Sequence, residues 1–130
     1  SIQSPQTFSV GDYTCTLTKL AITFARLEYE MTVTRSGDVS AAAAFEAGEP
    51  SLDFKLTLPE GQAFAQSTSV SMQTDGSLLL SGVYTLTQPA ESVTFTPILP
   101  DHLTEENNWM ADDYEPTEEE RRMAFTVEVH

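Results

Sequence analysis

Apolar and polar side chains alternate along most of the chain with a period of two residues, which suits a strand and not a helix. The clearest alternating runs cover 25–35, 51–58 and 123–129. Each run predicts a strand that buries one face. The residues expected in the core are Tyr29, Met31, Val33, Phe54, Leu56, Phe95, Phe125 and Val127.

Five further runs have extended character and lie at 7–10, 13–24, 64–74, 78–87 and 92–99, the run at 64–74 being weakly patterned. Within 13–24, Leu17 shares its phase with Tyr13, whereas Leu20 and Phe24 have the opposite phase, which predicts a bulge or bend at Thr18-Lys19. Asp75-Gly76 between two runs predicts a hairpin. Seven or eight strands separated by such turns predict an all-β fold, an antiparallel β-sandwich.

Two segments do not have the pattern of a strand. Residues 40–47 combine a candidate N-cap, Ser40, with strong helix formers and a following Gly48, which predicts one or two helical turns. Residues 101–122 form an acidic insertion before the last strand and hold nine of the twenty acidic residues. Thr117 and Glu120 have the spacing of a capping box, so we expect part of this insertion to be helical.

Length and charge narrow the classes of function. With 130 residues, the chain is expected to form a single domain, 1–130. Six Lys and Arg against twenty Asp and Glu give a net charge of −14, which makes a nucleic-acid partner or direct contact with an anionic membrane unfavourable. One cysteine allows no internal disulfide and no cysteine-based zinc site.

The acidic insertion contains the candidate metal ligands Asp112, Asp113 and Glu115, because clustered carboxylates are the ligands that Ca²⁺ prefers. Their spacing does not match the EF-hand loop. The alternative interpretation is a solvated loop with short capped helices, and we favour it.

Large amphipathic side chains lie in the same insertion. Trp109 and Tyr114 are the candidate ligand-binding residues, because exposed aromatic groups often anchor a partner. The alternative is that they fix the insertion onto the sandwich, as a long ordered loop requires, and this interpretation is preferred.

Motifs for catalysis are absent from the sequence. Neither a nucleophile elbow nor a phosphate-binding glycine loop occurs. Cys15 shares the phase of Tyr13 and Leu17, which predicts a buried thiol rather than a nucleophile. We expect no enzymatic activity and no cofactor.

The stretch "FSVGDYTCTLTKLAITFARLEYEMTV" resembles the start of immunoglobulin-like domains found outside Gram-positive cells, with matches at Gly11, Tyr13, Thr14, Thr16, Leu17 and Lys19. The later "GVYTLTQPAESVTFTPIL" is similar to the closing hairpin of those domains. They often form the ectodomain of single-pass membrane proteins, including anti-sigma-factor-like proteins. The resemblance implies an immunoglobulin-like sandwich that is extracellular or on the cell surface, with any membrane anchor outside this sequence.

The leading hypothesis for function is a non-catalytic extracytoplasmic module for interaction or sensing, part of a larger cell-surface protein, with an unidentified protein or small ligand as partner. Two alternatives stay open. One is a carbohydrate- or cation-binding module that uses the insertion, and the other is a structural subunit of an extracellular assembly.

Overall fold

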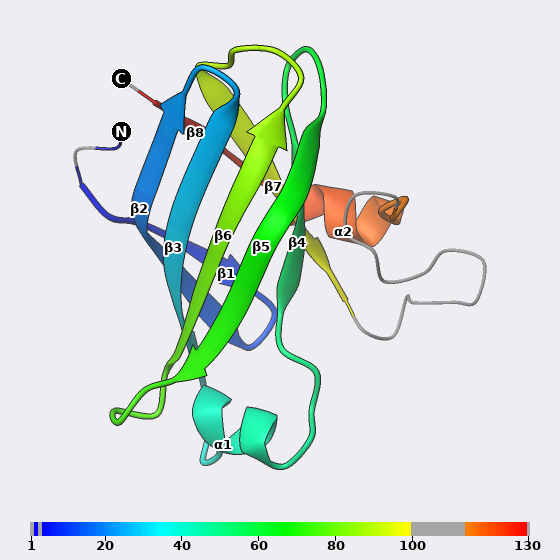
Figure 1. Ribbon diagram of the computed structural model, residues 1–130. Helices are drawn as coiled ribbons and strands as arrows, with labels where there is room; N and C mark the ends of the chain where they lie inside the picture. The colour runs from blue at the N-terminus through cyan, green and yellow to red at the C-terminus, as the bar shows by residue number, and fades with distance from the viewer. Residues whose placement is uncertain (1, 3, 100–113, 130) are drawn as a thin grey trace.

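The computed structural model describes residue 2 and residues 4–99 and 114–129 (Figure 1). These residues contain eight strands and two short helices. In chain order, the elements are β1 (Gln6–Val10), β2 (Tyr13–Thr23), β3 (Arg26–Arg35), α1 (Ala41–Glu46), β4 (Asp53–Thr57), β5 (Ala63–Met72), β6 (Leu78–Leu86), β7 (Ser92–Ile98), α2 (Glu118–Arg122) and β8 (Phe125–Glu128).

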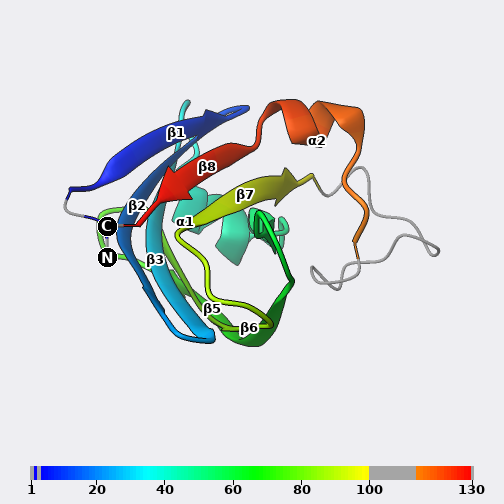
Figure 2. The ribbon, with the colours of Figure 1, turned by 90° about the horizontal axis from the view of Figure 1, so that it is seen from above.

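The strands form two antiparallel sheets that pack as two layers (Figure 2). One sheet has five strands in the order β1-β2-β3-β6-β5, and the other has three in the order β4-β7-β8. The expected all-β antiparallel sandwich is therefore confirmed. Residues from both sheets contribute to one hydrophobic cluster between the layers.

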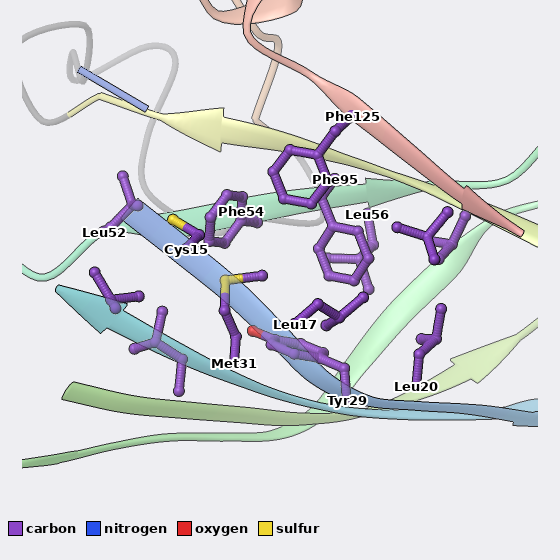
Figure 3. Packing of buried hydrophobic residues seen from close by; sticks show 14 of the residues in the cluster. Cys15, Leu17, Leu20, Tyr29, Met31, Leu52, Phe54, Leu56, Phe95 and Phe125 are labelled. Carbon is purple, nitrogen blue, oxygen red and sulfur yellow. The ribbon is translucent and has the colours of Figure 1, made fainter. Parts of the chain in front are cut away.

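Aromatic rings lie at the centre of this cluster (Figure 3). The Phe95 ring is 5.3 Å from Tyr29 and 5.3 Å from Phe125, measured between ring centroids, and 6.0 Å from Phe54. All eight residues that the alternation placed in the core are buried. Period-two patterning identified them because each strand buries one face and exposes the other.

The phase change in β2 corresponds to a bulge, as expected. The pairing of β2 with β3 shifts in register between Leu17 and Lys19, so that Cys15, Leu17 and Leu20 all reach the core. The strand stays in one sheet across this bulge.

Phe24 corrects the expected strand boundary. The alternation extended the strand to Phe24, in phase with Leu20, but β2 ends at Thr23 and Phe24 begins the turn to β3. Its φ of 49° lies in the left-handed region, and its side chain is 90% exposed. The tight turn reverses the chain here, so the alternation of the strand no longer determines where the side chain points.

The expected helices and the hairpin are present. Ser40 caps α1 by accepting a hydrogen bond from the Ala43 backbone N–H, and Thr117 and Glu120 form both bonds of the capping box of α2. Antiparallel strands β5 and β6 flank Asp75-Gly76, where Gly76 has a φ of 90° that favours glycine.

Gly82 leaves room for two tyrosine side chains on the buried face of the five-stranded sheet. It lies on β6 opposite Tyr29 of β3, and the rings of Tyr29 and Tyr84 are 6.2 Å apart between centroids. A Cβ atom at Gly82 would lie 2.6 Å from Tyr29 Cε1 and 2.8 Å from Tyr84 Cε1. No other residue therefore fits without moving one of the rings.

Candidate functional site

The sequence-predicted site residues fall into two groups. Trp109, Asp112 and Asp113 lie outside the described residues, so their roles stay predictions. Tyr114 and Glu115 are described and lie just before α2.

Tyr114 is completely buried. Its hydroxyl donates a hydrogen bond of 2.7 Å to Glu120, and its backbone carbonyl accepts one of 2.7 Å from the Lys55 ammonium on β4. Burial, and then the hydrogen bond and charge of Glu120, raise the pKa of the Tyr114 hydroxyl well above its ordinary value. The ring is closed to solvent and fixes this part of the chain against the three-stranded sheet.

Glu120 is the residue whose importance the sequence did not reveal. Its side chain is buried, and its two carboxylate oxygens accept from the backbone N–H of Leu99 at 2.5 Å and of Thr117 at 2.8 Å, in addition to Tyr114. The capping box predicted the contact with Thr117. The contacts with Leu99 and Tyr114 depend on the tertiary fold, and together the three donors satisfy a buried carboxylate. We name this cluster of Leu99, Tyr114, Thr117 and Glu120 the Glu120 junction.

Glu115 is exposed, and its carboxylate lies 3.4 Å from the Arg121 guanidinium. Exposed ion pairs of this kind stabilise a fold by about 0–1 kcal/mol. In the part of the chain that the structure describes, no group of three or more His, Cys, Asp or Glu is arranged to hold a metal ion.

A second candidate surface lies at one edge of the sandwich, because one sheet has five strands and the other only three. On one side of the sandwich, β1 lies beside β8 (Figure 2). There Phe8 of β1 stacks on Phe125 of β8, with ring centroids 3.8 Å apart, and this contact joins the two sheets. On the opposite side, β5 is the outer strand of the wider sheet, and among the described residues it pairs along its length only with β6. The narrower sheet ends at β4 and does not cover β5.

The exposure of β5 follows from this mismatch. Its ten residues, AFAQSTSVSM, include eight exposed ones, and only Ala63 is buried. By register, Val70 and Met72 lie opposite the buried Leu80 and Leu78, yet Met72 is 51% exposed. The weak patterning of 64–74 was the sequence signal for a strand with two exposed faces.

A groove separates β4 from β5. It has a volume of about 190 Å³ and is lined by Tyr29, Ser51, Leu52, Asp53, Thr68, Ser69, Val70 and Leu80. Asp53 is the charged residue in this lining, and its carboxylate accepts a hydrogen bond of 2.8 Å from the backbone N–H of Phe54. Burial, and then the nearby Tyr84 and Asp53, raise the pKa of the Tyr29 hydroxyl. Tyr29 therefore lines the groove as an uncharged side chain.

Acidic residues also lie in the turns at both ends of β5, with Glu60 before the strand and Asp75 after it. The carboxylate of Asp75 accepts hydrogen bonds from the hydroxyl and the backbone N–H of Ser77, which lower its pKa and keep it ionised. β5 itself has no charged residue. The site is thus an uncharged strand edge with acidic surroundings.

Cys15 is buried in β2, and burial raises the pKa of its thiol to about 12. A thiol in this state is a poor nucleophile. None of the described helices has the length and apolar character needed to cross a membrane. Comparisons with protein-family models, with curated proteins and with solved structures found no match for this chain.

Proposed function

We propose that this chain is a non-catalytic interaction or sensing module and that it contacts its partner at β5. The observation that carries the proposal is the stretch 67–72 of β5, which is uncharged and, among the described residues, pairs only with β6 and lies beside the groove, in a protein of net charge −14. Edge strands with unpaired backbone groups bind extended chains readily. Natural proteins usually protect such edges with charged residues, prolines, β-bulges or short strands. Within 67–72, β5 has no charged residue, no proline and no bulge.

The bulge between Ala65 and Ser67 is the one irregularity along this edge. It leaves the stretch 67–72 as regular strand. A site for protein recognition by backbone pairing needs about this length, because strands in globular proteins usually have three to ten residues.

The proposal extends to an immunoglobulin-like, extracytoplasmic domain of a larger cell-surface protein. The sequence resemblance supports it. The single cysteine is also compatible with an oxidising compartment, because a buried Cys15 is shielded from forming disulfides with other molecules. Labelling of intact source cells with a membrane-impermeant amine reagent tests this location, and modification only after lysis would contradict it.

Site-specific photo-crosslinking in the source cells tests the interaction function. A benzophenone amino acid is placed at Ser71 on β5 and, as the matched control, at Thr14, an exposed strand residue of β2. We expect a discrete protein adduct from position 71 and not from position 14. The adduct should disappear when Val70→Lys is added, since a charge on an edge strand opposes strand addition. Equal adducts from both positions, or none from position 71, would contradict the proposal.

A further inference from the structure

The β5 edge offers a regular backbone and small side chains. Over 67–72, every second residue directs its N–H and C=O away from β6, because backbone groups alternate sides along an antiparallel strand. Ser67, Ser69 and Ser71 are on the outer face, where the hydroxyl oxygens of Ser69 and Ser81 lie 2.6 Å apart. Such short side chains leave room for a neighbouring strand.

The inner face of the same stretch has apolar character. Val70 is half-buried at the groove, and Met72 is 51% exposed next to buried Leu78. A strand added beside β5 would place alternate side chains over these residues and into the groove of about 190 Å³. Its apolar side chains would thereby cover surface that β4 leaves open.

The electrostatic surroundings of β5 indicate the charge of the added strand. Glu60 and Asp75 stand beyond its two ends, and Asp53 lies above its middle in the groove. The described residues that line the groove include no Lys or Arg. Cationic groups at both ends of an added strand would therefore be attracted whether that strand runs parallel or antiparallel to β5.

A second copy of this chain fits the edge less well. In the register that pairs all ten residues of two antiparallel β5 strands, Glu60 of one copy lies toward Asp75 of the other at both ends. Each copy also carries a net charge of −14. Like charges placed opposite one another oppose association.

We infer that β5 accepts an extended segment of a partner protein as an additional strand, and that this segment is uncharged along β5 and carries Lys or Arg at both ends. The inference rests on the proposed function and specifies the partner's chemistry. Backbone hydrogen bonds to β5 provide affinity. The groove favours partner strands whose alternate residues are apolar or β-branched, and the acidic ends favour strands with terminal cations over strands without them.

Two synthetic peptides test the inference with the full chain. Both have the length of β5 and alternate threonine with valine; one has two lysines at each end and the other two glutamates. Their monomeric state is checked by sedimentation. Binding is measured by fluorescence anisotropy, and the contact is located by amide hydrogen exchange. We expect the lysine peptide to bind about tenfold more tightly at low salt, to protect amides of β5, and to lose this advantage as salt rises.

Three variants make the test specific. Glu60→Gln combined with Asp75→Asn should abolish the preference for lysine ends, and the new amide at position 75 keeps a side-chain oxygen for the bonds from Ser77. Val70→Lys should block both peptides, whereas Thr14→Lys adds the same charge on β2 and should leave binding at β5 nearly unchanged.

The outcomes separate the two proposals. Equal protection of β5 by both peptides would overturn the requirement for terminal cations and leave strand addition at β5 intact. Failure of both peptides at β5 would overturn the inference, while the crosslink from position 71 still decides the proposed function. Dimerisation that Val70→Lys abolishes would identify a second copy as the occupant and also overturn the inference.

Discussion

The Tyr114 hydroxyl donates a 2.7 Å hydrogen bond to the Glu120 carboxylate, and both side chains are inaccessible to solvent. The same carboxylate accepts the backbone N–H of Leu99 from the end of β7. The buried carboxylate of Glu120 thus has hydrogen-bond donors from Leu99, Tyr114 and Thr117. Such a cluster stabilises the fold only while all of its members are present.

Tyr114→Phe should therefore destabilise the protein by about 1.5–3 kcal/mol, the usual contribution of a hydrogen bond to a charged group. Glu120→Ala should cost more, because it leaves the donors of Leu99, Tyr114 and Thr117 without their acceptor. Urea denaturation followed by circular dichroism measures both changes. Glu118→Ala, at an exposed position of the same helix, is the matched control, and an equal loss in all three variants would show that the junction has no special role.

Stability should fall in alkaline solution. Burial raises the pKa of Cys15 from 9.0 to about 12 and raises those of Tyr29 and Tyr114 above their ordinary value of 10.0. Below about pH 8 these groups are almost fully protonated in both the folded and the unfolded chain, so their contribution to stability is fully present. Above pH 9 the unfolded chain releases protons that the folded chain retains, and unfolding becomes progressively more favourable. The urea concentration at the unfolding midpoint should therefore decrease as the pH rises from about 8 to 11. In the Tyr114→Phe variant this decrease should be less steep above pH 10, because one of the ionising groups is missing.

Phe125→Ala should cost about 3–5 kcal/mol, because it opens a cavity between the stacked rings of Phe8 and Phe95. Phe24→Ala removes the same side chain from a position that is 90% exposed, and keeps a Cβ atom in the same turn. Its effect should stay within about 0.5 kcal/mol. Thermal unfolding of the two variants compares them directly, and similar melting temperatures would contradict the assigned core.

Gly82→Ala should destabilise the protein by about 1–3 kcal/mol through overpacking, since the new methyl group meets Tyr29 and Tyr84 at less than van der Waals distance. Tyr29→Phe in the Gly82→Ala background should give no relief, because the clash is with the ring rather than the hydroxyl. Near-ultraviolet circular dichroism should register the displaced tyrosines. Replacement of Gly82 without loss of stability would show that the sheet adjusts freely.

Alternation predicted the strands because each has one face in the core, and the phase change even located the bulge after Leu17. The weak alternation of 64–74 indicated a strand that buries little of either face, but it could not reveal the cause, which is that the narrower sheet ends at β4. Nor could alternation predict the burial of Glu120, whose partner Leu99 is 21 residues away in sequence. Local spacing revealed the capping box and nothing beyond it. Of the candidate site residues, Tyr114 has a packing role that only the tertiary fold makes visible.

The Glu120 junction has a consequence for how this chain tolerates change in length. Leu99 and Tyr114 meet at one carboxylate, and Lys55 holds the backbone of Tyr114 from β4, so both ends of the intervening 100–113 are fixed to the sandwich. A polypeptide inserted between these two anchors has to close a loop whose ends are already placed. For a flexible inserted polypeptide, each doubling of its length costs only about 0.6 kcal/mol of closure entropy. The position is therefore a natural point for grafting a foreign peptide, or for evolution to vary one segment while the eight strands keep their register.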